Sequence, residues 1–277
     1  MRFYCSLPNI KKAKTVLVGV PYDGTSTYRP GSRFAPQAIR EASYGIESYS
    51  PYQDKDLRDI RFYDIGDMPL SYGDKKLNLN IIELFISKLI SKGRRVVSLG
   101  GEHLITYPIV KAHAKKYKDL TVLQLDAHSD LIDSFRGETY SHATVMRRCS
   151  ELVGFENLYQ LGIRSMVKED RLLPLRDVNM GLFDLSKAQE FLERIKDRPI
   201  YLTIDLDVLD PSIFNGTGTP EPGGISYKEL IEFIKLLKGK RIVGADIVEL
   251  SPHYDASGVS SVVAASITKE ILLLIND

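Results

Sequence analysis

Short runs of β-branched and aromatic residues alternate along the chain with longer segments that have helical periodicity. Eight runs are predicted to form strands, at residues 14–20, 60–65, 95–100, 121–126, 157–162, 179–184, 198–205 and 241–248. Seven segments are predicted to form helices, at residues 36–48, 77–92, 106–117, 142–151, 186–196, 227–238 and 257–275. Such alternation is typical of parallel βαβ units. It predicts an α/β fold of three layers, α/β/α, with a central, mainly parallel eight-stranded sheet.

Length, composition and charge narrow the class of protein. The chain has 277 residues, of which 43% are hydrophobic, and no linker composition divides it, so residues 1–277 are expected to form a single domain. The 37 basic and 36 acidic residues are mixed along the sequence, which gives no electrostatic basis for binding nucleic acid or an anionic membrane. Two distant cysteines, Cys5 and Cys149, fit a reducing compartment and exclude a thiolate zinc site. Without a signal-peptide core or an apolar stretch of ~18 residues, the chain is expected to be soluble and cytoplasmic.

The stretch TVLQLDAHSD, residues 121–130, leads from an apolar run into three potential metal ligands. An extended chain places alternate side chains on one face, so Asp126, His128 and Asp130 can converge on one point. Two carboxylates and an imidazole directed together are poorly stabilised unless a cation lies between them. The alternative for this stretch alone is a strand that ends in an ordinary polar loop.

Two further strand-like runs end in the same kinds of side chain. Residues 201–211, YLTIDLDVLDP, carry Asp205 and Asp207 on one face if the chain is extended. Residues 96–103, VVSLGGEH, reach His103 through two glycines that permit a sharp turn. Because open parallel sheets build their sites at the carboxyl ends of strands, ligands that are distant in sequence can meet there. Together the three runs favour a metal site over loop polarity.

The remaining histidines and a strand-end glutamate have alternative interpretations. His142 opens a helical pattern, where it is either a polar residue near the helix start or an imidazole held over the site. His113 lies in a lysine-rich helix and is expected on the surface, and His253 is expected to be a loop residue. Glu249 is either a solvated strand end or a carboxylate placed to pair with a cationic substrate. Strand periodicity directs it to the face opposite Asp246.

Five spaced motifs together resemble those of the ureohydrolases, the arginase and agmatinase family. They are GGEH (100–103), DAHSD (126–130), SHATVMRR (141–148), DLDVLDP with the GTGTP loop (205–220) and the strand-end Glu249. The resemblance covers nearly the whole chain, including GVPYD (19–23) and PGSRFAPQAIR (30–40). It is closer to agmatinases than to arginases, chiefly in the segment after DAHSD. The fold that it implies is the arginase-like three-layer α/β/α fold.

The resemblance also implies a cofactor, two Mn(II) ions per chain. One ion would be bound by His103, Asp126, Asp130 and Asp205, and the other by Asp126, His128, Asp205 and Asp207. Asp126 and Asp205 would therefore bridge the two ions. The residue chemistry agrees, because oxygen ligands with imidazole and no thiolate suit Mn(II), and a pair of such ions can activate a shared water.

By the same resemblance, three residues would serve catalysis or substrate binding. Asp130 would orient the attacking water, His142 would bind substrate and shuttle a proton, and Glu249 would hold the guanidinium through charge-assisted hydrogen bonds. The implied reaction is hydrolysis of agmatine to urea and putrescine in polyamine biosynthesis, by a homo-oligomer, a trimer or hexamer. The chain departs from residues common in the family at Glu102, Ala143 and Asn215, which affects the shape of the pocket and removes no proposed ligand.

Three alternatives remain open at this level. A sister amidinohydrolase, such as an arginase or an enzyme acting on guanidinobutyrate, formiminoglutamate or aminopropylagmatine, would share every metal ligand. A non-catalytic binding homologue is the second, and a sugar-nucleotide transferase with a DxD motif is the third, although it would leave DAHSD without a role. Agmatine is favoured over arginine because residues 131–140, LIDSFRGETY, add Asp133 and Glu138, which are expected to repel a carboxylate. Arg136 would oppose this preference if it faced the pocket.

Overall fold

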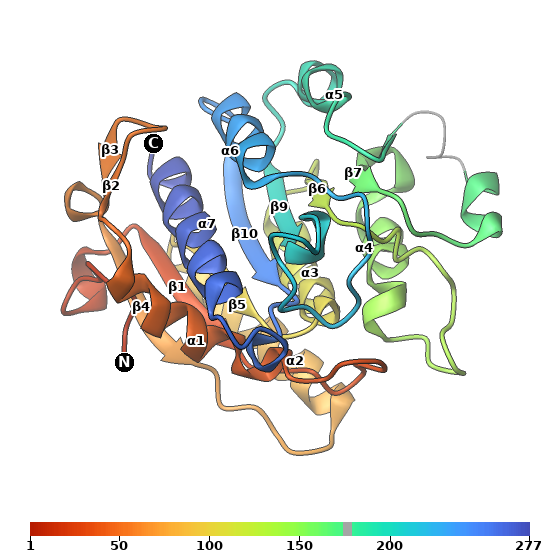
Figure 1. Ribbon diagram of the computed structural model, residues 1–277, viewed down its shortest axis with the longest axis horizontal. Helices are drawn as coiled ribbons and strands as arrows, with labels where there is room; N and C mark the ends of the chain where they lie inside the picture. Colours follow the sequence, from red (N-terminus) through yellow and green to blue (C-terminus); the bar gives the residue numbers. More distant parts are fainter. Residues whose placement is uncertain (174–178) are drawn as a thin grey trace.

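A computed structural model, which describes residues 1–173 and 179–277, contains the predicted parallel sheet. Its eight strands lie in the order β4-β1-β5-β10-β9-β6-β7-β8, and every neighbouring pair is parallel (Figure 1). The strands are β1 (Thr15–Val20), β4 (Phe62–Asp67), β5 (Arg95–Gly100), β6 (Thr121–Leu125), β7 (Leu158–Ile163), β8 (Met180–Leu182), β9 (Ile200–Asp205) and β10 (Ile242–Val248). The predicted fold class and all eight strand positions are confirmed.

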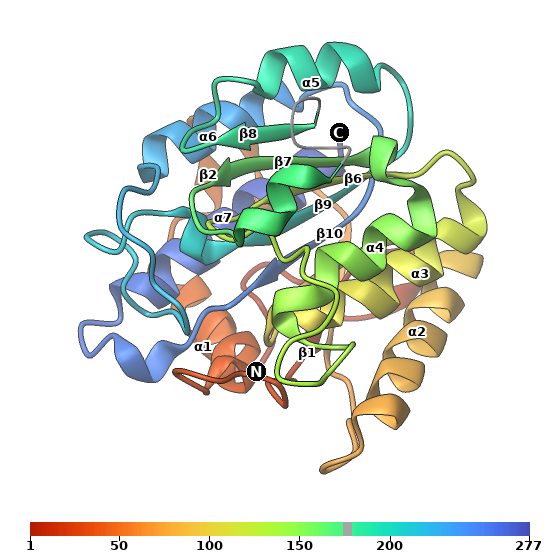
Figure 2. The ribbon, with the colours of Figure 1, turned by 90° about the vertical axis from the view of Figure 1, so that its right-hand side faces the viewer.

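Alternating side chains of the strands bury two separate apolar layers, one on each face of the sheet. Leu17 of β1 packs in the same cluster as Ile39, whereas its neighbours Val16 and Val18 pack in the cluster that contains Ile82. The first layer is covered by α1 (Ala35–Ala42), α5 (Ala188–Ile195), α6 (Tyr227–Leu236) and α7 (Val259–Ile275). The second is covered by α2 (Lys75–Ser91), α3 (Thr106–Lys116) and α4 (Val145–Val153) (Figure 2). Period-two strands between two sets of helices therefore produce the α/β/α arrangement.

The order of the strands brings the motif-bearing segments together. The last two strands of the chain, β9 and β10, lie between β5 and β6. The carboxyl ends of these four central strands lead into the segments that carry His103, Asp126, Asp205 and Glu249. Because all four strands are parallel, these ends lie at one edge of the sheet, where open α/β sheets place their binding sites.

The structure differs from the prediction mainly at the ends of helices. The predicted helix 36–48 ends at Ala42, and a short antiparallel pair, β2 (Tyr49–Ser50) with β3 (Lys55–Asp56), follows it. Strands of two residues are too short to give a periodic signal. The predicted helix 142–151 starts as a 3₁₀ turn, His142–Thr144, which Ser141 caps before α4 begins. Within the described residues, no helix is long and apolar enough to cross a membrane.

The prediction that His113 is a surface residue was wrong, because its side chain is fully buried. Its Nδ1 atom lies 2.9 Å from the carbonyl oxygen of Ile109, one turn earlier in α3, and its ring packs 4.8 Å from that of Tyr201. A Cβ atom at Gly244 would lie only 2.4 Å from His113 Nε2, so that glycine makes room for the ring. The neighbouring lysines reach solvent while His113 points towards the sheet, a distinction that residue type alone does not reveal.

Burial of His113 should make the stability of the fold sensitive to acid. Burial lowers the pKa of His113 from 6.5 to about 4. Above pH ~6.5 the ring is neutral in both states, and its contribution is fully present. As the pH falls from ~6.5 towards 4, the unfolded chain binds a proton that the folded chain resists. The free energy of unfolding should therefore fall by up to ~1.4 kcal/mol per pH unit from this group.

Urea unfolding of His113→Gln and of the parent chain between pH 7 and pH 4 checks this dependence. The difference in free energy of unfolding between the two proteins should shrink as the pH falls, because glutamine does not titrate. His253→Gln, at an exposed histidine, is the matched control and should follow the parent. A pH-independent difference for His113→Gln would show that the buried ring does not resist protonation.

Candidate metal centre and active-site cleft

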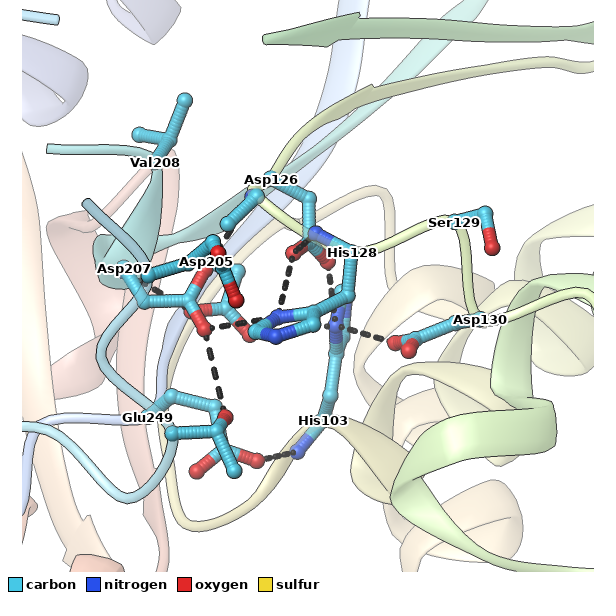
Figure 3. A network of polar contacts seen from close by, with 12 residues as sticks. His103, Asp126, His128, Ser129, Asp130, Asp205, Asp207, Val208 and Glu249 are labelled. Carbon is cyan, nitrogen blue, oxygen red and sulfur yellow. Dashed lines mark hydrogen bonds and ion pairs between the residues drawn. The ribbon is translucent and has the colours of Figure 1, made fainter. Parts of the chain in front are cut away.

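Three carboxylates converge on one nitrogen of His103, as Figure 3 shows. The His103 Nδ1 atom lies 3.0 Å from Asp126 Oδ2, 3.1 Å from Asp130 Oδ2 and 3.3 Å from Asp205 Oδ2. This nitrogen is buried and has no hydrogen-bond partner among the described residues. The three carboxylate oxygens therefore gather around this nitrogen instead of forming separate hydrogen-bonded pairs, as expected for ligands of a cation.

A second group of ligand atoms adjoins the first. His128 Nδ1 lies 3.0 Å from Asp207 Oδ2 and 3.6 Å from Asp126 Oδ1. Asp126 thus directs one oxygen towards each group, which is the geometry required of a bridging ligand. Asp205 directs Oδ2 towards His103, and its Oδ1 accepts a hydrogen bond of 2.9 Å from the backbone N–H of Asp207. All six residues that the sequence predicted as ligands lie together.

The electrostatics of the two groups favour a bound cation. Burial acts to lower the pKa of His128, but the carboxylates of Asp207 and Asp126 outweigh it and raise that pKa to about 12. Burial, together with the negative charges of Asp207 and Asp126, raises the pKa of Asp205 well above its usual range. Burial next to Asp126 likewise raises the pKa of Asp130 to about 6. Positive charge is thus stabilised and negative charge is crowded, and a donor set of oxygens and imidazole nitrogens fits divalent ions such as Mn(II).

Local backbone features place these ligands. Gly101 lets the backbone after β5 pass close to that of Tyr22, because a Cβ atom there would lie 2.0 Å from the carbonyl oxygen of Tyr22. Asp130 has a positive φ of 53°, which is uncommon for a residue other than glycine and indicates local strain. Its carbonyl oxygen accepts two hydrogen bonds of 3.1 Å from the N–H groups of Met146 and Arg147 in the first turn of α4. The helix start therefore holds Asp130 in this conformation.

Glu249 is a buried carboxylate beside the ligand groups and not a solvated strand end. It follows β10 directly, has a φ of 65°, and the residue is 7% exposed. Its Oε1 atom accepts a hydrogen bond of 2.8 Å from the backbone N–H of His103. Burial and the negative charge of Glu102 raise the pKa of Glu249 well above its usual range. Asp246 instead accepts hydrogen bonds from Thr106 and Tyr201 at 2.8 and 2.6 Å, away from Glu249.

His142 lies across from these carboxylates and lines the same cleft. Its backbone belongs to the 3₁₀ turn that Ser141 caps, so the turn fixes the backbone position from which the side chain extends. The ring of Phe135 packs against it edge to face, with 5.6 Å between the ring centroids. Burial, assisted by His128 and His103, lowers the pKa of His142 to about 4. The interpretation of His142 as an imidazole held at the site is favoured over that of a residue that only marks the helix start.

A cleft of about 320 Å³ joins these groups to an apolar wall. Polar residues of the ligand groups line its floor, with His142 and Glu249 beside them. Thr219 of the GTGTP loop also lines the cleft. The apolar side of the cleft is formed by Ile132, Phe135, Met166 and Val167. The site can therefore hold a short apolar chain that ends in a cation.

The predicted repulsion by Asp133 and Glu138 was wrong, because neither carboxylate lines this cleft. Asp133 is 78% exposed at its side chain and pairs with Arg148 at 2.6 Å, while Glu138 pairs with Lys75. Arg136 lines a neighbouring cavity of about 750 Å³, where its guanidinium lies 5.5 Å from the centre of the Phe135 ring. The segment after DAHSD therefore supplies apolar surface and not charge to the cleft.

Several residues that support the ligands were not identified from the sequence. Gln124 Nε2 donates a hydrogen bond of 2.6 Å to Asp126 Oδ2. Arg164 Nη2 donates to the carbonyl oxygens of Asp207 and Glu221 at 2.7 and 2.8 Å, and so ties the Asp207 turn to the loop that follows. Arg164 immediately follows β7 and Gln124 lies inside β6, so their positions at the carboxyl ends of strands were the available signal.

Comparisons with known proteins agree with this geometry. The model of the arginase family matches residues 13–274. An agmatinase of Bacillus anthracis is 45% identical over 276 residues, which cover 98% of this chain and 95% of that protein. The solved agmatine ureohydrolase of Thermoplasma volcanium is 33% identical with a TM-score of 0.89, covering 99% of this chain and 94% of that one. The proclavaminate amidino hydrolase of Streptomyces clavuligerus is 31% identical with a TM-score of 0.91, covering 100% and 97%.

These matches span the sheet, the helices on both of its faces and all the segments that carry the clustered ligands. The predicted resemblance is thus confirmed over nearly the full length of the chain. Two relatives at 45% identity bear the name agmatinase. With a shared fold, a full-length family match and the converging ligands, the chain belongs to the arginase family and is a hydrolase.

Proposed function

We propose that this chain hydrolyses agmatine to urea and putrescine, a step of polyamine biosynthesis, with two Mn(II) ions held by the six clustered ligands. The observation that carries the proposal is the shared carboxylate Asp126 between two ligand groups, next to a cleft with a buried carboxylate and an apolar wall. Relatives at 42–45% identity bear the name agmatinase, which supports the choice of substrate.

The protein groups around the site match the needs of the reaction. A guanidinium is a poor electrophile, and the bound ions would supply the nucleophile by lowering the pKa of a water. Glu249 holds and orients the guanidinium through charge-assisted hydrogen bonds. Asp130, at the edge of the His103 group, orients the attacking water, and His142 accepts a proton and delivers it to the departing amine. The lowered pKa of about 4 keeps His142 neutral at neutral pH, so a ring nitrogen with a free lone pair is available to accept a proton.

The cleft wall supports agmatine over arginine. The two substrates share a guanidinium and a methylene chain, and arginine adds a carboxylate that needs a partner when it leaves water. Neither a lysine nor an arginine lines this cleft among the described residues, and Ile132, Met166 and Val167 offer apolar contact to the chain. A buried charge without a partner costs several kcal/mol, so agmatine is expected to be preferred by at least ~10²-fold in kcat/KM.

Urea release by the Mn(II)-loaded protein from a panel of guanidino compounds tests both the reaction and the substrate. The panel contains agmatine, arginine and 4-guanidinobutyrate, which present an amine, an amino acid and a carboxylate at the distal end. Equal release from arginine and agmatine, or activity confined to 4-guanidinobutyrate, would reassign the substrate within the family. No urea from any compound by the metal-loaded protein would indicate a binding homologue.

A further inference from the structure

A buried hydrogen-bond network links Glu102, the residue before His103, to His142 through Thr25. Glu102 is fully buried. Both of its carboxylate oxygens accept from the backbone N–H of Thr25 at 3.0 Å, and they accept further from Thr25 Oγ1 at 2.7 Å and from Ser26 Oγ at 2.9 Å. In its carboxylate form Glu102 accepts in every one of these contacts, and the surrounding N–H and O–H donors stabilise that form.

The hydrogen bond from the Thr25 hydroxyl to Glu102 determines how the same hydroxyl can interact with His142. A hydroxyl has one proton, and that of Thr25 is given to Glu102, so the oxygen can only accept on its other side. Thr25 Oγ1 accepts a hydrogen bond of 3.0 Å from the backbone N–H of His142 and lies 3.4 Å from His142 Nδ1. The contact with Thr25 Oγ1 is a hydrogen bond only when Nδ1 carries the proton of the neutral ring, so this geometry favours the Nδ1–H tautomer. Ser141 Oγ, 3.3 Å from Nδ1, can donate or accept and does not select a tautomer.

We propose that Glu102 and Thr25 are positioning residues that hold neutral His142 in its Nδ1–H tautomer. Nε2, to which no described residue donates or accepts a hydrogen bond, then keeps its lone pair for the cleft. The consequence for catalysis rests on the proposed proton-shuttle role of His142. Nε2 takes a proton from the attacking water, the ring becomes an imidazolium, and the same proton leaves from Nε2 to the amine. The Nδ1 proton stays in place throughout the cycle.

Three substitutions separate this role from general packing. Thr25→Val is nearly isosteric and removes the hydroxyl, whereas Thr25→Ser restores it. Ser26→Ala is the matched control, because it removes another hydroxyl donor to Glu102 that makes no hydrogen bond to His142 among the described residues. None of the three changes a proposed ligand or a charge.

The direct readout is the ¹⁵N chemical shift of each ring nitrogen of His142 in the full-length, metal-free chain, where no paramagnetic ion broadens the signals. The chain has five histidines, so His142→Gln assigns the resonances. Thr25→Val should lose the Nδ1–H signature, while Thr25→Ser and Ser26→Ala keep it. With Mn(II) and agmatine, kcat of Thr25→Val should fall by about 10- to 10²-fold, within the range for acid–base groups, with KM and metal content little changed.

The outcomes distinguish this inference from the proposed function. Retention of the Nδ1–H signature in Thr25→Val would overturn it, and so would an equal loss of that signature in Ser26→Ala, which would indicate general loosening of the loop. A changed tautomer in Thr25→Val with unchanged turnover would support the positioning role and remove His142 from the proposed mechanism instead.

Discussion

Replacing Asp126 by asparagine should abolish urea release and leave the purified chain with little bound metal. Asp126 is fully buried, and its two oxygens face different ligand groups, Oδ2 towards His103 and Oδ1 towards His128. Asparagine keeps the shape and removes the charge, so both ions lose a ligand at once. Added Mn(II) should restore activity to the metal-stripped parent chain and not to Asp126→Asn, because binding requires deprotonated ligands.

Metal content per chain, measured by mass spectrometry after dialysis, is the primary readout. His103→Ala should be less severe than Asp126→Asn, since His103 contacts only one ligand group. Asp205→Asn should resemble Asp126→Asn if Asp205 bridges the ions, and His103→Ala if Asp205 serves only the group that its Oδ2 faces. Two ions per chain retained in Asp126→Asn, or full turnover by a verified metal-free parent, would contradict the binuclear assignment.

The sequence contained enough information for the sheet and for the cluster of candidate metal ligands because both depend on short-range patterns. Alternation of apolar residues places Asp126 at the end of β6 and Asp205 at the end of β9, and parallel strands bring such ends to one edge. The insertion of β9 and β10 between β5 and β6 is a long-range property. The sequence patterns did not predict this strand order.

Side-chain burial and pairing could not be obtained from the same patterns. His113 lies among lysines in sequence, yet its turn of α3 faces the sheet. Asp133 and Glu138 follow the DAHSD motif, yet each finds a basic partner outside the cleft. Thr25 contacts Glu102 and His142, which are 77 and 117 residues away in sequence, so no local signal marks it. Such contacts depend on tertiary packing between loops, which the periodic pattern of a single strand or helix does not reveal.

Glu249→Gln should reduce kcat/KM for agmatine by roughly 10- to 10²-fold, because a charge-assisted hydrogen bond contributes about 1.5–3 kcal/mol. The substitution is nearly isosteric, and the amide oxygen can still accept the hydrogen bond from the His103 backbone N–H that Glu249 Oε1 now accepts. The charge that faces the substrate is lost while the backbone of β10 and the ligand His103 stay in place. Weaker competitive inhibition by guanidinium ion should accompany the loss of turnover.

Metal content separates a role in substrate recognition from a role in holding the metal site. Glu249→Gln should retain as much Mn(II) as the parent, and Glu83→Gln, which removes a carboxylate that pairs with Lys111 and Lys115 outside the cleft, is the matched control for loss of one charge. Unchanged kinetics in Glu249→Gln would reduce this residue to a structural strand end. The positive φ of 65° and the burial beside Glu102 place a costly carboxylate at the cleft, and under the proposed function a cationic guanidinium would offset this cost.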